Sequence, residues 1–175
     1  MKTRNLLTLL IAVFASSVAF SQTQYEVLVE RPNEKTYKGI ISKETLLNDT
    51  TFKWYAQNLK GYTPNAGGVE AFKNNKDTSI QLITFMGTWC EDSHNIIPKF
   101  YSFLDATGFS KDRVTLIGVD RNKKTISHLA EALNVKNVPT IIVMKNGKEV
   151  GRVVEYGKYG LFDKELGEIV TSASK

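Results

Sequence analysis

Two patterns of hydrophobic and polar positions alternate along the second half of the chain. Short apolar runs are typical of buried strands, and apolar positions three and four residues apart are typical of one face of a helix. The runs predict strands over residues 81–86, 114–119, 140–144 and 149–154, and the longer spacing predicts helices over 95–106, 125–133 and 161–170. Asn146-Gly147 predicts a two-residue hairpin between the last two strands.

The predicted order of elements from residue 81 is β-α-β-α-β-β-α. We expect the first two connections to join parallel strands through helices, and the hairpin to add an antiparallel strand at the edge of the sheet. This arrangement belongs to the α/β class. It predicts a three-layer α/β/α sandwich around a mixed sheet of four or slightly more strands.

The residues before this pattern predict an N-terminal extension that packs on the domain. We divide the chain into a leader over residues 1–21, an extension over 22–70 and a domain over 71–175. The pattern also predicts strands over 25–29 and 37–41, a helix over 51–59 capped by Thr50 or Thr51, a loop over 62–68 and a helix over 69–76.

The leader has the composition of a secretory signal peptide. Lys2 and Arg4 precede an apolar run from Leu6 to Phe20, and Ala19 and Ser21 are the small residues expected before a cleavage site. An uncleaved membrane anchor is the alternative, which the shortness of the apolar run disfavours. We therefore expect an exported protein, periplasmic or secreted, with no membrane attachment after cleavage.

The charge of the chain excludes one class of partner. The formal net charge of +5 falls to +3 when the leader, with Lys2 and Arg4, is removed. Charges of both signs are interspersed along the rest of the chain, so we expect ordinary surface charge and no nucleic-acid-binding surface. Neither charge nor composition assigns an oligomeric state.

Cys90 is the only cysteine of the chain. A single cysteine in an exported protein pairs with another molecule or remains a reactive thiol, and the alternative is a buried, inert residue. Because Cys90 precedes a predicted helix, unpaired backbone N–H groups and the helix dipole favour its thiolate. Ser93 lies one turn further on, where its hydroxyl is expected to donate to that thiolate.

Three more residues near Cys90 are expected to modulate its ionisation. His94 shares a helical face with Cys90 and favours the thiolate when it is protonated. Glu91 and Asp92 carry negative charges that oppose ionisation of the thiol. Their presence also has a purely structural explanation, because carboxylates stabilise the first turn of a helix.

Four motifs occur in an order that resembles the thioredoxin family. They are Trp89-Cys90 after the first strand, Pro98 eight residues later, Val138-Pro139-Thr140, and the hairpin around Asn146-Gly147. The resemblance covers about residues 71–170, and the Cys90-x-x-Ser93 form resembles an exported single-cysteine subgroup. It implies a cis Pro139 against the sulfur, Trp89 as a platform beside it, and Val138 as a backbone edge for an extended substrate.

Two departures from the family pattern bear on function. Ser93 occupies the place of the second cysteine, so the resemblance implies that an external thiol must resolve any mixed disulfide. Thr84 occupies the place of a buried acid six residues before the first cysteine, so the associated proton relay is expected to be absent. Ordinary dithiol reduction of disulfides is therefore not expected.

Two functions remain open from the sequence. The first is thiol–disulfide exchange with exported client proteins or small thiols, in which Cys90 and Ser93 are catalytic and no cofactor is needed. The second is a non-catalytic module that binds peptides in a groove beside Trp89, Val138 and Pro139. Metal binding by Cys90, Asp92 and His94 is disfavoured because structural zinc sites usually have four ligands.

Overall fold

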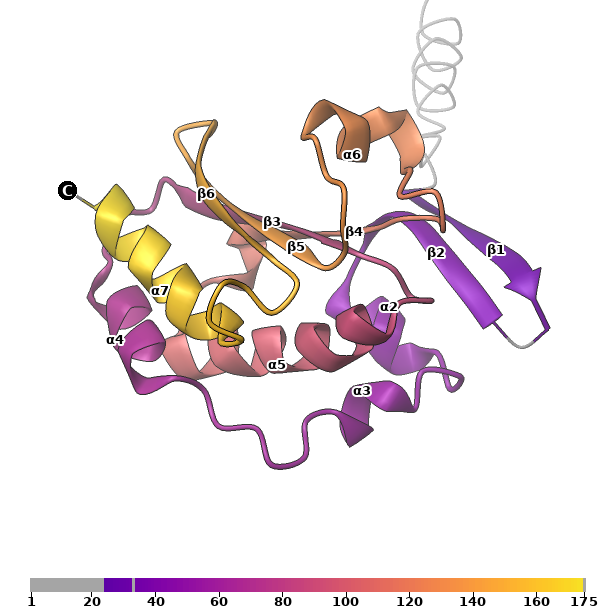
Figure 1. The fold of residues 1–175 in the computed structure, drawn as a ribbon, viewed down its shortest axis with the longest axis horizontal. Helices are drawn as coiled ribbons and strands as arrows, with labels where there is room; N and C mark the ends of the chain where they lie inside the picture. Colours follow the sequence, from indigo (N-terminus) through magenta and orange to yellow (C-terminus); the bar gives the residue numbers. More distant parts are fainter. Residues whose placement is uncertain (1–23, 33, 175) are drawn as a thin grey trace, which may run out of the picture.

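The computed structural model describes residues 24–32 and 34–174, so the predicted signal peptide lies outside the described residues. Six strands form one mixed sheet in the order β1-β2-β4-β3-β5-β6 (Figure 1). The strands are β1 Tyr25–Arg31, β2 Glu34–Ile41, β3 Ile80–Met86, β4 Val114–Gly118, β5 Thr140–Lys145 and β6 Lys148–Val154. The α/β/α sandwich is thus confirmed, and its sheet contains two strands beyond the four of the basic prediction.

The connection between β4 and β5 was predicted to join parallel strands, and the structure shows that this prediction is wrong. β3 pairs with β4 in parallel, but β5 pairs antiparallel with β3, so β4 and β5 run in opposite directions. The chain between them contains only a four-residue helix, α6 (Leu129–Ala132). At 1.5 Å per residue this helix is about 6 Å long, whereas a parallel crossover must return along the full strand, about 17 Å for β4. The chain therefore enters β5 from the same end of the sheet at which β4 leaves it.

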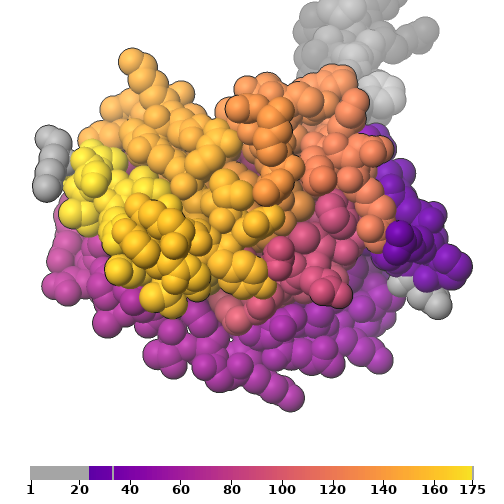
Figure 2. Space-filling model, in the orientation of Figure 1, coloured from indigo at the N-terminus to yellow at the C-terminus, as the bar shows by residue number. Residues whose placement is uncertain are grey.

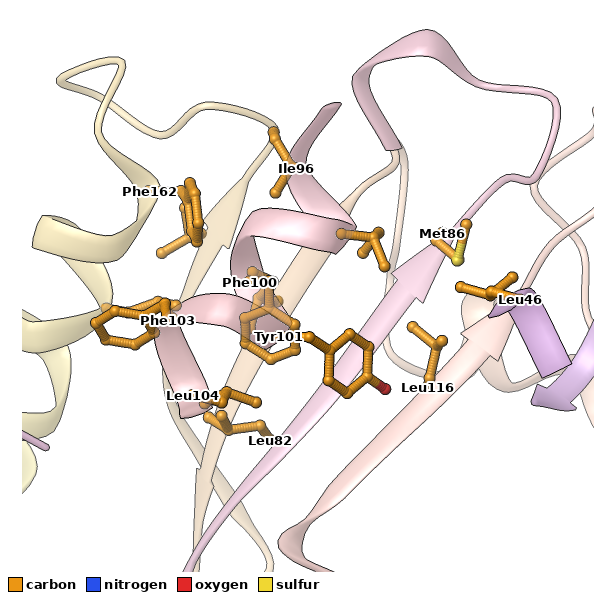
Figure 3. Packing of buried hydrophobic residues seen from close by; sticks show 14 of the residues in the cluster. Leu46, Leu82, Met86, Ile96, Phe100, Tyr101, Phe103, Leu104, Leu116 and Phe162 are labelled. Atoms are coloured by element: carbon orange, nitrogen blue, oxygen red, sulfur yellow. The ribbon is translucent and has the colours of Figure 1, made fainter. Parts of the chain in front are cut away.

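Helices α4 (Ala66–Asn74), α5 (Glu91–Thr107) and α7 (Phe162–Ala173) cover one face of the sheet, and α6 lies on the other (Figure 1). The larger apolar cluster fills the space between the sheet and α5, where Phe100, Phe103 and Leu104 are fully buried (Figure 3). A smaller cluster around Phe85, beneath α6, contains the other buried apolar side chains.

The helix predicted over residues 125–133 is wrong in its first half. Ser127 and His128 adopt left-handed φ angles of 60° and 55°, which break the segment into a short 3₁₀ turn and α6. The side chain of Ile126 lies against Gly39 of β2 instead of the smaller cluster, which Leu129 and Ala130 join. The break thus lets one segment pack at two separate places on the sheet.

The extension has more structure than its pattern predicts. β1 and β2 pair antiparallel, and β2 also pairs antiparallel with β4, from Gly39 opposite Gly118 to Ile41 opposite Leu116. An unpredicted helix, α2 (Lys43–Asn48), follows Ser42, whose side chain accepts a hydrogen bond from the backbone of Thr45. The predicted helix over 51–59 is reduced to the single turn α3 (Trp54–Gln57).

Two glycines allow α4 and α7 to pack at backbone distance. A Cβ atom on Gly68 would lie 2.4 Å from the carbonyl oxygen of Asp163, and one on Gly167 would lie 2.7 Å from the Cα of Gly68. The buried carboxylate of Asp163 accepts hydrogen bonds from Tyr62 Oη and the backbone N–H of Asn65, both 2.7 Å long. These contacts join the end of the extension to the last helix.

Substitution of adjacent glycines in α4 tests this contact. We expect Gly68→Ala to lower the free energy of unfolding by about 1–3 kcal/mol, because the added methyl group overpacks the helix pair. Gly67→Ala is the matched control, since its Cβ would meet only the Asn65 side chain at 3.4 Å, and we expect it to raise stability by about 0.5–1 kcal/mol. Urea unfolding measures both; equal stabilisation by the two variants would contradict the close approach.

Candidate functional site

Cys90 is the N-cap residue of α5. Its backbone N–H donates to the carbonyl of Gly87 at 3.0 Å, and its carbonyl accepts the first helical hydrogen bond from His94 N at 2.9 Å. The half-buried thiol donates to the carbonyl oxygen of Val138 at 3.2 Å and gives no capping bond to the helix. The sulfur is thus placed at the open N–H groups of the first turn, as its sequence position predicts.

The Val138-Pro139 segment faces the sulfur. The peptide bond between these residues is cis, as the resemblance implies. The side chain of Val138 is buried in the smaller apolar cluster, and its carbonyl is the acceptor for Cys90. Thr140 Oγ1 donates to the carbonyl of Asn137 at 2.7 Å and closes the turn. The backbone edge assigned to Val138 therefore lies directly at the thiol.

Ser93 is fully buried, and its hydroxyl oxygen accepts a hydrogen bond from Gly87 N at 3.1 Å. This bond ties the first turn of α5 back to the loop that follows β3. This bond uses the hydroxyl oxygen of Ser93 as an acceptor, and donation of its O–H to the Cys90 thiolate stays a prediction. Ser93 holds the geometry around the sulfur.

His94 makes its contacts away from the sulfur. Its Nε2 lies 2.7 Å from the carbonyl oxygen of Thr88, and its ring stacks on Trp54 with centroids 4.3 Å apart. Burial lowers the pKa of His94 below its ordinary value of 6.5, so the imidazole is neutral at pH 7 and donates to Thr88. It contributes no positive charge to the site under these conditions.

The two acidic residues occupy the first turn of α5. Glu91 is exposed, whereas Asp92 is half-buried, and its carboxylate lies near the hydroxyl of Tyr156. The same hydroxyl accepts from Asn95 Nδ2 at 3.0 Å. Burial is the largest cause that raises the pKa of Tyr156, and the nearby Asp92 carboxylate raises it further. Tyr156 is a site residue that the sequence does not indicate, because it lies in the loop between β6 and α7.

Trp89 forms a fixed, half-buried platform. Its indole N–H donates to the carbonyl of Val119 at 3.0 Å, and the guanidinium of Arg121 lies 5.2 Å from the ring centroid. The indole also lies over Gly87, where a Cβ atom would come within 2.7 Å of it. Arg121 in turn pairs with Glu34 of β2. Contacts from the segment after β4 and from its own loop therefore hold the ring.

Thr88 connects the loop before Cys90 to the extension. Its hydroxyl donates to the carbonyl of Lys35 at 2.8 Å and accepts from the backbone N–H of Tyr37 at 3.1 Å. Both partners belong to β2, more than fifty residues earlier in the chain. Sequence reasoning missed this residue because a threonine beside a cysteine carries no signal of so distant a partner.

Thr84 occupies the position of the family's buried acid and is fully buried in β3. Its hydroxyl has no hydrogen-bond partner among residues 24–32 and 34–174, which marks a polar atom in an apolar environment. A hydroxyl cannot take the place of a carboxyl group as a proton acceptor at neutral pH. The structure thus provides no buried acid at this place.

The described part of the chain contains no group of three His, Cys, Asp or Glu side chains that could hold a metal ion. Cys90, Asp92 and His94 are directed to Val138, Tyr156 and Thr88 respectively. Over residues 24–32 and 34–174, no helix has the length and apolar character needed to cross a membrane.

Comparison with known proteins agrees with this geometry. A family profile described as Thioredoxin matches residues 69–164, more than half of the chain. The thioredoxin of Echinococcus granulosus is 31% identical over 86 residues, which are 49% of this chain and 75% of that protein. The thioredoxin of Chlamydia pneumoniae is 33% identical over 91 residues, 51% of this chain and 76% of that protein.

Among solved structures, mitochondrial thioredoxin 3 of Saccharomyces cerevisiae aligns with a TM-score of 0.39 and 19% identity, over 59% of this chain and 84% of that chain. The fold and the site define a thioredoxin-like protein. The chain belongs to the thioredoxin family, and is a redox protein of that family with a single cysteine.

Two threonines near the site give opposite expectations when the hydroxyl is removed. We expect Thr88→Val to lower the free energy of unfolding by about 1–3 kcal/mol, because it leaves two backbone groups of β2 unpaired. Thr84→Val removes a hydroxyl without a partner, so we expect a change between zero and a gain of about 1.5 kcal/mol. Chemical denaturation of both variants checks this, and a loss at Thr84 as large as at Thr88 would contradict the assignment.

Burial of neutral His94 predicts a pH dependence of stability. Because its pKa is lower in the folded state, the unfolded chain binds the proton first; stability is therefore present above about pH 6.5 and lost as pH falls below it. We expect His94→Gln to reduce the loss of unfolding free energy between about pH 7.5 and 5.5.

His128→Gln is the matched control for this measurement, since the His128 side chain is 80% exposed and pairs with the Glu131 carboxylate at 3.0 Å. Because this pair stabilises the fold only when the imidazole is protonated, we expect that variant to lose at least as much stability as the native protein over the same range. A loss in His94→Gln equal to the native one would show that the imidazole is not held neutral.

Proposed function

We propose that this protein is an exported monothiol exchange protein that forms a mixed disulfide at Cys90. The Cys90 thiolate attacks a disulfide of a client, one client sulfur becomes bonded to Cys90, and the other leaves as a thiolate. An external thiol then displaces Cys90. The leader pattern of Lys2, Arg4 and the apolar run supports export.

The observation that carries the proposal is the placement of the Cys90 sulfur. It lies at the start of a seventeen-residue helix, half-exposed, and contacts the carbonyl of the residue before the cis proline. Unpaired N–H groups at this helix end favour the thiolate. The buried Ser93 hydroxyl occupies the position of a resolving thiol, which supports resolution from outside.

A non-catalytic binding module is the second candidate. One observation favours it: the Cys90 thiol donates to Val138 and lies against the smaller apolar cluster, as an inert core cysteine does. In this case the groove beside Trp89 and Pro139 would bind a peptide without exchange. The reactivity of the thiol in the folded protein distinguishes the two functions.

Reaction with 5,5′-dithiobis(2-nitrobenzoate) tests the proposal on the folded mature protein. We expect Cys90 to release one equivalent of thionitrobenzoate and to retain the other in a stable mixed disulfide until a small thiol is added. Ser93→Cys restores a thiol one helical turn away, so we expect that variant to release a second equivalent without added thiol.

Cys90→Ser is the control and should release nothing. A native thiol that reacts only after unfolding in urea would overturn the exchange function and favour the binding module. Persistence of the adduct in Ser93→Cys would show that residue 93 does not occupy the resolving position.

A further inference from the structure

A concave pocket of about 460 Å³ lies along α5. Its walls come from the segment 60–65, from α5 and from the loop between β6 and α7. In Figure 2 the magenta of the N-terminal segments, the rose of α5 and the yellow-orange of the C-terminal part meet on one face. The volume lies toward the lower end of the range of about 300–1,000 Å³ that ligand pockets occupy. The pocket therefore suits a small molecule.

The pocket is separate from the site of Cys90. Its lining includes neither Cys90 nor Val138, whose carbonyl the sulfur contacts. Lys99 does line the pocket, and it follows Cys90 by nine residues, which is about two and a half turns of α5. Its side chain therefore leaves the helix on the side opposite to the sulfur. A ligand in this pocket is thus bound without contact with the thiol.

The walls of the pocket are rich in aromatic and apolar side chains. The rings of Tyr62 and Phe162 stack with their centroids 6.2 Å apart and an interplanar angle of 21°. Ile96 and Phe162 lie at one edge of the larger cluster (Figure 3). Tyr156 and Leu161 also line the pocket and remain 38% and 47% exposed. Exposed apolar side chains that gather at a pocket indicate a binding surface, and aromatic walls favour a ligand with a ring.

The charged groups that remain available in the pocket are positive. Lys60 and Lys99 line it, and neither forms an ion pair within residues 24–32 and 34–174. Lys99 is half-buried and donates to Asn95; because an ammonium group has three donors, two remain for a ligand. Asp163 also lines the pocket, but its carboxylate is buried and accepts three hydrogen bonds from the protein. The charge of the pocket thus favours an anion.

We propose that this pocket binds a small aromatic carboxylate. The ring of the ligand lies against Tyr62, Phe162 and Ile96, and its carboxylate pairs with the ammonium groups of Lys60 and Lys99. An uncharged ring leaves both ammonium groups unpaired, and a carboxylate without a ring leaves the apolar walls in water, so the pocket selects for both parts. This binding function is additional to the exchange proposed for Cys90 and does not depend on it.

Three naphthalene compounds of similar size and different charge test the pocket. Calorimetry measures the Kd of the folded mature protein for anionic naphthoate, neutral naphthalenemethanol and cationic naphthylmethylamine. We expect naphthoate to bind about ten-fold more tightly than the alcohol, because only naphthoate forms charge-assisted hydrogen bonds, and we expect the amine to bind more weakly than both. Acetate, which has the charge without the ring, should show no measurable binding.

Substitutions in the lining assign the binding to its two parts. In the double variant Lys60→Gln/Lys99→Gln, we expect the Kd for naphthoate to rise about ten-fold and that for the alcohol to stay unchanged. In Leu161→Ala, both Kd values should rise about three-fold, because an apolar contact is lost. The exposed position of Leu161 makes this variant safe for folding, and the melting temperature of each variant is measured to confirm it.

Two control proteins separate the pocket from net charge and from the thiol. Lys73→Gln/Lys148→Gln removes the same charge from α4 and β6, away from the pocket lining, and should retain the native Kd for naphthoate. Cys90→Ser should also bind naphthoate with the native Kd, because the ligand does not contact the sulfur.

Four outcomes would overturn the inference. They are equal binding of the three compounds, an unchanged Kd for naphthoate in Lys60→Gln/Lys99→Gln, an equal rise of that Kd in the lysine control, and loss of binding in Cys90→Ser. Binding of a peptide of alternating acidic and aromatic residues, with no binding of naphthoate, would assign the pocket to a partner protein and overturn it as well. Each of these results leaves the release of thionitrobenzoate by Cys90 as a separate test of exchange.

Discussion

The two hydrogen bonds between Thr88 and β2 constrain the loop on which the rest of the site depends. The loop leaves the central strand β3, crosses the end of the sheet and starts α5 at Cys90. Its backbone groups are paired with Ser93 and within the turn, and its tryptophan is held by Val119 and Arg121. Because these contacts come from β2, β4 and α5 together, the position of the sulfur is a property of the whole sheet.

The electrostatics of the site follow from the same packing. His94 is stacked on Trp54 and bonded to Thr88, so burial keeps it neutral and removes the cation nearest to the sulfur in sequence. The carboxylate of Asp92 lies near the hydroxyl of Tyr156, whose pKa it raises. The backbone N–H groups at the start of α5 therefore supply positive potential at Cys90 without a contribution from His94.

The hydrophobic pattern predicts an element where its side chains meet the core in one regular way. Strand β3 was predicted in place because its continuous apolar run is buried on both faces of the sheet, against both clusters, and helix α5 because its apolar stripe meets the larger cluster. The segment 125–133 was not, since Ile126 packs on Gly39 while Ala130 packs on the smaller cluster, and one helix cannot serve both places. Cys90 and Pro139 follow from local motifs, whereas Thr88 and Tyr156 depend on partners far along the chain, which no local pattern encodes.

The chain has no second thiol at position 93, and its N-terminal extension packs around the site of Cys90. Ser93 serves the loop backbone, and Thr84 supplies no acid, so resolution of a disulfide at Cys90 requires a reagent that arrives from solvent. The extension holds the side of the site near Thr88 and Trp54, and its segment 60–65 forms a wall of the pocket on the side of Tyr156. The glycine contact between α4 and α7 fixes that wall against the C-terminal helix. The extension thus both positions the sulfur and forms one wall of a pocket along α5.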